Sequence, residues 1–376
     1  MYGGDGLARL EGKIVFTPYV LPGEIVRADL ARVKNDLWRG RLLEVIEPSP
    51  SRVTPQCPYF LRCGGCQYQH AEYGYQVEQK RAILLEVLRR VGKIELDREI
   101  EAIAGDPWQY RNRAQLHIEN GAVGYFKHGS HDLCAIGHCP IVSPALNNAI
   151  SILNAELPRF RWLTTTVELF TNEVQMQVNA LDRVPVPVRQ VFDSLGTRDA
   201  LEYNGCRVSR NSFFQVNRFL IDPLVECARW DASGESAVDL YAGVGLFSRR
   251  LAERFKKVIA VESSHSAFRD LEHNTRELPI AAQHMTAEEY LRSLEQTPDF
   301  ILADPPRAGL GKQVVRELVR ISAPRLTIVS CDPATLARDL RGLLSAGYQI
   351  GKLTLVDLFP QTFHIETIVH LEHGSA

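Results

Sequence analysis

The sequence predicts an α/β protein whose C-terminal half is a Rossmann-like domain, preceded by a small β-barrel and a mixed α+β central segment. Three observations support this fold class. From about residue 236 onward, short apolar runs alternate with helical patterns, which is typical of a parallel sheet with helices on both faces. Residues 1 to about 47 alternate apolar and polar side chains between glycine turns, as half-buried strands do. A cluster of three cysteines stands between these regions.

The segment after the first module contains a linker, a helix and a mixed region. Prolines at 48, 50 and 55 are typical of a linker. Residues 72–92 are predicted to be a helix, because apolar residues recur at helical spacing from Leu84 to Val91 and Gly92 provides a stop. From about 100 to 205, alternating runs predict strands with few helices.

The C-terminal half is predicted element by element. Strands are expected at 237–241, 257–262, 280–284, 299–304, 325–331, 349–358 and 365–371. Helices are expected to begin near residues 246, 265, 287, 311 and 333. Only a short loop around Pro360 joins the last two strands, so the final strand should be antiparallel to its neighbour.

The composition is that of an ordinary globular protein of 376 residues, 45% hydrophobic and 23% charged. No apolar stretch is long enough to span a bilayer and the start lacks a secretory pattern, so we expect a cytoplasmic protein. We also expect a monomer. A net charge of −2 excludes a global nucleic-acid signature, which leaves local basic patches or merely solvated charges. The patches are Arg27, Arg32, Lys34, Arg39 and Arg41, and Arg81, Arg89 and Arg90.

A glycine turn follows the first strand of the C-terminal half, in Asp239-Leu-Tyr-Ala-Gly-Val-Gly245. Glycines let the backbone approach a ligand closely, although packing turns look the same. Tyr241 lies within this turn, and Glu262 ends the next strand, where a carboxylate can bind ribose hydroxyls. A phosphate-binding Gly-x-x-x-x-Gly-Lys motif is absent from the sequence, which argues against a phosphate cradle.

Three further residues are predicted at the same edge of the sheet. Asp304 is followed by two prolines, which cannot continue a strand and expose the carboxylate, unless this is a plain turn. Cys331 ends the next strand; such a cysteine is usually inert, but the start of a helix favours the thiolate. Glu366 begins the antiparallel strand and therefore lies where the parallel strands end. This convergence with Tyr241 and Glu262 favours a functional site.

The segment Asn211-Ser-Phe-Phe-Gln-Val-Asn217 precedes the C-terminal α/β half. Its two aromatic residues and its amides are suited to stack on and hydrogen-bond an extruded base. Alternatively, the phenylalanines belong to the core, an interpretation that fits them better than it fits Gln215.

Cysteines form the last candidate site. Cys57, Cys63 and Cys66 are closely spaced, and a distant Cys139 precedes a proline. Four thiolates suit zinc or an iron–sulfur cluster, and the broken second pair favours the cluster. Cys134 is a rival fourth ligand, whereas Cys206 and Cys227 are interpreted as packing residues. Chance clustering is the weaker alternative.

Five motifs together resemble the RNA uracil-5-methyltransferases that use S-adenosylmethionine. They are Asn211-Ser-Phe-Phe-Gln-Val-Asn, Asp239-Leu-Tyr-Ala-Gly-Val-Gly, Asp304-Pro-Pro-Arg-Ala-Gly, Ser330-Cys-Asp-Pro-Ala-Thr-Leu-Ala-Arg-Asp and Phe359-Pro-Gln-Thr-Phe-His-Ile-Glu. The cysteine cluster resembles the iron–sulfur subgroup, mostly 23S rRNA methyltransferases. Residues 1–50 resemble a TRAM domain, an oligonucleotide-binding β-barrel, and from the resemblance we expect an incomplete barrel or a start that lies upstream of residue 1.

This resemblance implies a role for each candidate residue. Cys331 would be the nucleophile and Glu366 the base, while Gln215, Tyr241, Glu262 and Asp304 would line the cofactor and uracil site. Cys57, Cys63, Cys66 and Cys139 would hold a [4Fe-4S] cluster. Residues 51–68 and 101–210 would form the central iron–sulfur domain, and residues 69–100 and 211–376 the catalytic domain.

Three alternatives remain open at this point. The same reaction on tRNA differs from the favoured 23S rRNA reaction only in RNA selection. An RNA-binding assembly factor with an inactive methyltransferase fold would not need both Cys331 and Glu366. An enzyme that methylates amino groups of bases uses an Asn/Asp-Pro-Pro-aromatic turn and no thiol, so Arg307 and Cys331 count against it.

Overall fold

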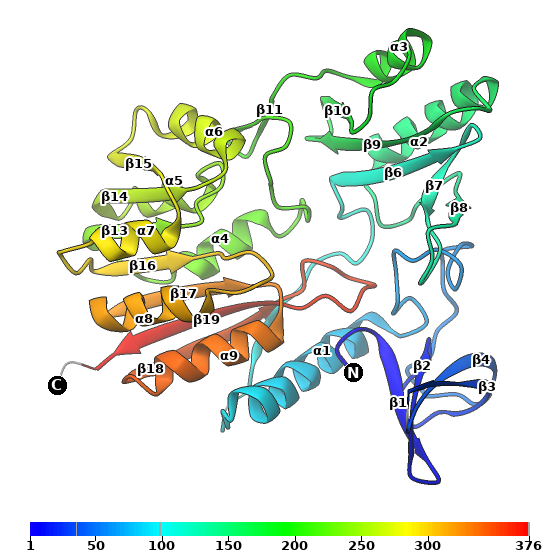
Figure 1. Cartoon of the computed structure of the whole chain (residues 1–376), viewed down its shortest axis with the longest axis horizontal. Coiled ribbons are helices and arrows are strands. Elements are labelled where there is room, and N and C mark those ends of the chain that lie inside the picture. Colours follow the sequence, from blue (N-terminus) through cyan, green and yellow to red (C-terminus); the bar gives the residue numbers. More distant parts are fainter. Residues whose placement is uncertain (35, 98, 375–376) are drawn as a thin grey trace.

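The computed structural model describes residues 1–34, 36–97 and 99–374, so residues 98, 375 and 376 of the expected catalytic segment and residue 35 of the expected N-terminal module lie outside it. The chain forms an N-terminal sheet, a central sheet with its own helices, and a larger C-terminal sheet flanked by helices (Figure 1). This arrangement confirms the predicted α/β fold class with an N-terminal β module. None of the helices in the described part of the chain has both the length and the apolarity needed to cross a bilayer.

The N-terminal module is a four-stranded sheet in the order β1-β2-β4-β3. Its strands are β1 (Asp5–Leu10), β2 (Lys13–Pro18), β3 (Ile25–Lys34) and β4 (Leu37–Glu47). Two antiparallel hairpins, β1–β2 and β3–β4, are joined by parallel pairing of β2 with β4. Within the described residues β1 and β3 remain the two edges, so backbone hydrogen bonds do not close the sheet into a barrel.

The central part is an antiparallel sheet in the order β10-β9-β6-β7-β8 with helices packed against it. The strands are β6 (Arg113–Glu119), β7 (Ala122–Phe126), β8 (Leu133–Ala135), β9 (Thr164–Thr171) and β10 (Met176–Ala180), and the helices are α2 (Pro144–Glu156), a 3₁₀ turn (Leu157–Arg159) and α3 (Val186–Leu195). Alternate residues of β6, including Leu116 and Ile118, are fully buried against Ile150 and Leu153 of α2. A short hairpin, β11 (Leu201–Tyr203) and β12 (Cys206–Val208), leads to the catalytic part.

The catalytic part is an eight-stranded sheet in the order β15-β14-β13-β16-β17-β19-β18-β5. Its strands are β5 (Glu101–Ile103), β13 (Gly234–Leu240), β14 (Phe255–Glu262), β15 (Ile280–His284), β16 (Phe300–Ala303), β17 (Arg325–Ser330), β18 (Tyr348–Val356) and β19 (Glu366–His373). Its helices are α4 (Ile221–Arg229), α5 (Leu246–Leu251), α6 (His265–Thr275), α7 (Ala287–Ser293), α8 (Gly311–Ile321) and α9 (Pro333–Leu344). Every predicted strand and helix is present within a few residues, whereas α4 was not predicted.

Two apolar cores cover the two faces of this sheet, as the alternation predicts. Side chains of α7, α8 and α9 form one core, and side chains of α4 and α5 belong to the other. β19 runs antiparallel to both β17 and β18, which confirms the prediction drawn from the short loop. The start of β19 therefore meets the ends of the parallel strands.

Helix α1 (Tyr73–Val87), which continues into a π turn (Leu88–Gly92), packs on the catalytic part although the central part follows it in sequence. Leu84 and Leu88 are fully buried in the same core as Leu336 and Leu340 of α9. β5 then pairs with β18 and extends the catalytic sheet. The expected boundary at residue 101 is thus displaced, because β5 belongs to the catalytic sheet and not to the central segment.

A buried ion pair joins α1 to the end of β18. Lys80 Nζ donates to Asp357 Oδ1 at 2.6 Å and to the Phe359 carbonyl at 3.0 Å, and both charged side chains are fully buried. Removing one partner of such a pair leaves an uncompensated buried charge. We therefore expect Lys80→Met to lower the free energy of unfolding by about 3–5 kcal/mol in chemical denaturation.

The matched control for this prediction is Arg89→Met, which removes an exposed pair with Glu86 at the end of the same helix. Its cost should be far smaller, because solvent screens an exposed ion pair. Equal losses in the two variants would contradict the role given to Lys80. The double variant Lys80→Met/Asp357→Leu should recover much of the loss, because it leaves no unpaired charge.

Candidate active site

The strand register places the five predicted edge residues at one end of the catalytic sheet. Leu240, the last residue of β13, pairs with Val261 on one side and with Ala303 on the other. Tyr241, Glu262, Asp304 and Cys331 each lie at or just after the end of their strand, and Glu366 begins β19 opposite Val356, the last residue of β18. The sheet therefore brings these side chains to the edge where ligands of open α/β sheets bind.

The glycine turn after β13 is fixed by the carboxylate of Glu262. Glu262 Oε2 accepts from the Gly243 N–H at 2.8 Å, and its Oε1 accepts from the Ser264 N–H at 2.6 Å. Gly243 has φ +57°, and an added Cβ would meet no atom within 4 Å. The turn therefore borders open space, and its left-handed backbone suits glycine. A ligand can approach this backbone while remaining within reach of Glu262.

Three carboxylates make this end of the sheet favourable for a cation. Asp239 is fully buried behind the turn and accepts a hydrogen bond from the Ser248 hydroxyl. The pKa of Asp239 is raised to about 7, mainly by burial and also by Asp304 and Glu262, against the opposing effect of the Ser248 hydrogen bond. Burial also raises the pKa of Asp304 to about 7. A positively charged ligand in this site would favour the ionised forms.

Cys331 and Glu366 are electrostatically coupled. Burial raises the pKa of the Cys331 thiol to about 11, and the charges of Glu366 and Asp304 act in the same direction, while Arg307 opposes them. Burial raises the pKa of Glu366 well above its usual range, Asp304 adds to this, and Arg307 again opposes. Burial and acidic neighbours therefore disfavour the ionised form of both groups in the ligand-free protein. The start of α9 was expected to lower the pKa of Cys331, but burial and acidic neighbours raise it instead.

Residues 211–217 lie between the central and catalytic parts. The Val216 carbonyl accepts from the Asn112 N–H at 2.9 Å, and Asn217 Nδ2 donates to the Leu358 carbonyl at 3.1 Å. Phe214 is buried in the core, as the packing interpretation expects, whereas Phe213 is 64% exposed and lies outside that core. Gln215 is buried, and its side-chain amide makes no hydrogen bond to any described residue.

The four predicted cysteine ligands line one cavity of about 180 Å³. None of them forms a disulfide, and Cys134 is not among the lining residues. Burial raises the pKa of all four thiols, to about 12 for Cys63, and neighbouring cysteines act in the same direction. No three His, Cys, Asp or Glu side chains in the described chain are close enough to hold a single metal ion. The four thiols therefore line a cavity and do not converge on the position of a single metal ion.

A pair of glutamines that sequence reasoning missed fixes the loop before Glu366. Gln361 donates from its N–H to Gln76 Oε1, and Gln76 Nε2 donates to Gln361 Oε1, both at 3.0 Å. The Gln361 carbonyl accepts from the N–H groups of Gln67 and Tyr68, both at 2.9 Å. The chain immediately after Cys66 is thus bonded to the loop that leads to Glu366. Gln361 lies within a motif that the sequence had already singled out, but its partner on α1 is 285 residues away.

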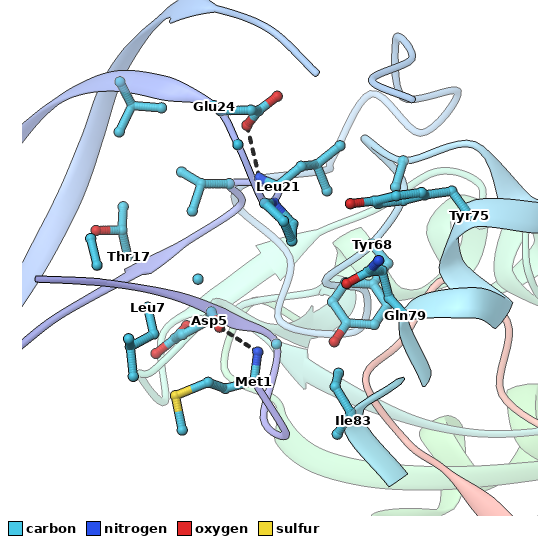
Figure 2. A pocket seen from close by; sticks show the side chains of 18 of the residues that line it. Met1, Asp5, Leu7, Thr17, Leu21, Glu24, Tyr68, Tyr75, Gln79 and Ile83 are labelled. Carbon is cyan, nitrogen blue, oxygen red and sulfur yellow. Dashed lines mark hydrogen bonds between the residues drawn. The ribbon is translucent and has the colours of Figure 1, made fainter. Parts of the chain in front are cut away.

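A separate hollow of about 440 Å³ lies between the N-terminal module and α1 (Figure 2). Tyr68, Tyr75 and Gln79 line one side of it, and Asp5 and Glu24 lie on the other. Its described lining contains no lysine or arginine and none of the sheet-edge residues. It is therefore distinct from the site around Cys331 and is poorly suited to bind phosphate.

Comparison with known proteins agrees with this geometry. A family model described as tRNA (uracil-5-)-methyltransferase matches residues 191–374. An RNA methyltransferase of Thermosynechococcus vestitus is 32% identical, over 98% of this chain and 95% of its own length. A 23S rRNA (uracil(1939)-C(5))-methyltransferase of Pectobacterium atrosepticum is also 32% identical, over 99% of this chain and 92% of its own.

A solved structure extends the likeness to the whole fold. The tRNA (uracil-54, C5)-methyltransferase of Pyrococcus abyssi, in complex with S-adenosyl-L-homocysteine, has a TM-score of 0.76 at 25% identity and covers 98% of both chains. The fold and its sheet-edge site define an S-adenosylmethionine-dependent methyltransferase. More specifically, the chain belongs to the RNA uracil-5-methyltransferase family.

Proposed function

We propose that this RNA uracil-5-methyltransferase methylates C5 of a uridine in 23S rRNA through a covalent bond to Cys331. The observation that carries the mechanism is the coupled Cys331–Glu366 pair at the carboxyl edge of the sheet. The 23S rRNA substrate is supported by the Pectobacterium relative, which is more similar in sequence than the Pyrococcus tRNA enzyme. We expect the protein to act as a monomer in the cytoplasm.

The chemistry explains why a thiol and a carboxylate are both needed. C5 of uracil is a poor nucleophile, so the Cys331 thiolate adds to C6 and pushes the C5–C6 π electrons into an enolate. C5 then forms its bond to the methyl group, and the donor sulfur keeps the electron pair of the broken bond. The carboxylate of Glu366 removes the remaining C5 proton, which restores the double bond and expels the Cys331 thiolate.

The turn after β13 and the end of β14 fit the methyl donor. Gly243 offers an open backbone and Glu262 offers carboxylate oxygens for ribose hydroxyls, while Tyr241 and Asp304 complete this edge. When bound, S-adenosylmethionine supplies an electrophilic methyl group and a positive charge that lowers the pKa of nearby acidic groups. The unbonded amide of Gln215 is suited to bind the polar edge of the uracil.

We propose that Cys57, Cys63, Cys66 and Cys139 hold a [4Fe-4S] cluster. The fit rests on four cysteines that form no disulfide and line one cavity, with Cys66 buried and the other three partly buried. The cluster would supply a covalent anchor for segments far apart in sequence. Its role is structural in this proposal, because its ligands adjoin the chain that holds Gln361.

Cys63→Ala tests the cluster by measurements other than activity. We expect loss of most bound iron and sulfide, a lower melting temperature, and RNA binding weakened about tenfold through loss of local order. Cys227→Ala, a cysteine of α4 outside the cavity, should keep full iron content. A folded Cys63→Ala protein that lacks iron but keeps full RNA affinity and activity would contradict the structural role.

Gln76→Ala tests the glutamine pair. The variant removes both side-chain contacts to Gln361, so the loop before Glu366 loses its anchor on α1. Proton removal at C5 should slow by about tenfold, because small displacements of a catalytic group reduce rates strongly. The expected signature is a larger fraction of enzyme trapped as a denaturant-resistant RNA adduct in gel electrophoresis.

Gln79→Ala is the matched control for this test, since Gln79 lies one turn further along α1 and lines the separate hollow. It should leave the adduct fraction unchanged. If Gln76→Ala merely lowers the amount of folded protein without raising that fraction, Gln76 has no role in positioning Glu366.

The substrate is tested by incubating the purified protein and S-adenosylmethionine with unmodified 23S rRNA or unmodified tRNA, and then measuring 5-methyluridine by mass spectrometry. The proposal predicts product on 23S rRNA alone. Product on tRNA alone would keep the mechanism and replace the substrate. No product on either RNA from cluster-loaded protein would favour a non-catalytic RNA-binding factor.

A further inference from the structure

Six arginines from both sides of the junction between the central and catalytic parts line two adjoining grooves. The grooves have volumes of about 260 and 270 Å³ and share Arg198 and Arg210. We call them together the arginine groove, and its arginines are Arg183, Arg189, Arg198, Arg207, Arg210 and Arg269. Five of these six side chains are exposed, and Arg207 is half-buried.

The positive charge of the arginine groove is only partly compensated by neighbouring carboxylates. Arg183, Arg189, Arg210 and Arg269 make no ion pair with any described residue, whereas Arg198 pairs with Asp193 and Arg207 pairs with Asp270 at 3.7 Å. The lining contains three carboxylates against six guanidinium groups, in a chain whose net charge is −2. Such a concentration of one sign on a nearly neutral protein indicates a surface for a polyanion.

Two of the three lining carboxylates are held by hydrogen bonds from neutral protein donors. Asp270 is buried and accepts from the Ser209 N–H and from the hydroxyls of Ser209 and Ser212. Asp182 accepts from the Thr165 hydroxyl at 3.2 Å. These two carboxylates are thus occupied by protein donors, while the free guanidinium groups face solvent.

The arginine groove leads to the active site along the chain. Asn211 lines it, is bonded to Asn179 of β10 at 3.1 Å, and begins the segment that contains Gln215. The exposed Phe213 lies between the two along this segment. An RNA strand whose base reaches Gln215 can therefore continue past Phe213 toward Arg210 and Arg269.

We propose that the arginine groove binds the phosphodiester backbone of the RNA strand next to the target uridine. Arginine binds phosphate oxygens in fork geometry, and such contacts position the strand without reading its sequence. This inference rests on the proposed function for its substrate, but it concerns RNA binding and is measured separately from methylation.

The test uses the triple variant Arg189→Ala/Arg210→Ala/Arg269→Ala in the full-length, cluster-loaded protein. The dissociation constant for a fluorescent RNA fragment containing the target uridine is measured over a series of salt concentrations. Each lost phosphate contact to a single strand reduces the slope of log K against log salt by about 0.7, so we expect a reduction of about 2. Affinity at low salt should fall by about 10–100-fold, with kcat at saturating RNA unchanged within about twofold.

Two further variants separate charge from folding. Arg254→Ala/Arg292→Ala/Arg341→Ala removes three exposed arginines outside the arginine groove and should leave the slope nearly unchanged. Replacing Arg189, Arg210 and Arg269 by lysine keeps the charge and should preserve most of the slope. Melting temperatures confirm that all variants fold.

Unchanged salt dependence in the alanine variant, with methylation by the wild type intact, would overturn the arginine groove and leave the proposed function standing. If the wild type methylates no RNA, the proposed function fails, but the slope still decides whether the groove binds phosphates. A loss that depends on the flanking sequence would show base reading instead, and would also contradict the proposal.

Discussion

Cys331→Ala should abolish RNA methylation, with a loss of roughly 10⁴-fold or more, because no other group in the proposed mechanism makes C5 nucleophilic. No denaturant-resistant RNA adduct should form. The side chain is partly buried, and alanine removes only its sulfur, so the fold and the binding of the methyl donor should persist. Product formation by quantitative nucleoside mass spectrometry, alongside donor affinity by calorimetry, checks both expectations.

Cys206→Ala, a buried cysteine of β12 away from the sheet edge, is the matched control and should retain near-normal activity. The pH dependence gives a second check. The ligand-free pKa of Cys331 is about 11, so its thiolate fraction grows as pH rises, and wild-type methylation should accelerate from about pH 6 to about pH 9. Substantial methylation by Cys331→Ala would rule out the covalent route.

Glu366→Gln should stop the reaction one step later. The amide keeps the size of the side chain but cannot accept the C5 proton, so methylated RNA should remain attached to Cys331. We expect turnover to fall by roughly 10²–10⁴-fold while a methylated adduct accumulates to a large fraction of the enzyme. Gel electrophoresis with radiolabelled methyl donor measures this adduct.

The fold should tolerate this substitution well. Burial and Asp304 raise the pKa of Glu366 well above its usual range, so the folded, ligand-free protein favours the neutral form that the amide resembles. Glu372→Gln, further along β19, serves as the control and should turn over normally. Loss of product by Glu366→Gln without any adduct would mean that Glu366 acts before or during thiol addition, and the assigned base would be wrong.

The alternating pattern of the C-terminal half was sufficient to predict its strands and helices. The direction of β19 followed from the short loop around Pro360, and with it the placement of Glu366 beside the ends of the parallel strands. Local patterns succeed here because buried strands of a doubly wound sheet are continuous apolar runs. The three-residue β5 escaped prediction, since its pairing with β18 depends on a long-range contact rather than on its own sequence.

The sequence was sufficient to predict which residues form the candidate site. It did not predict their pKa values or the contacts that hold the neighbouring loop in place. The sequence placed Cys331 at a helix start, yet only the structure shows that burial and two carboxylates dominate its pKa. The Gln76–Gln361 pair links residues 285 positions apart, and neither glutamine carries a local signal for the other. The arginine groove likewise combines α3, the 198–210 connection and α6, which are separated in sequence.

The central claim is a covalent bond between Cys331 and C6 of a uridine that has been methylated at C5. The most direct measurement is intact-protein mass spectrometry after incubation with S-adenosylmethionine and an RNA whose target uridine carries fluorine at C5. Fluorine cannot be removed as a proton, so the elimination step is blocked and the adduct persists. The account predicts a mass increase equal to one methylated RNA fragment, located at Cys331 by peptide mapping. An unmodified protein mass, or attachment at another cysteine, would contradict it.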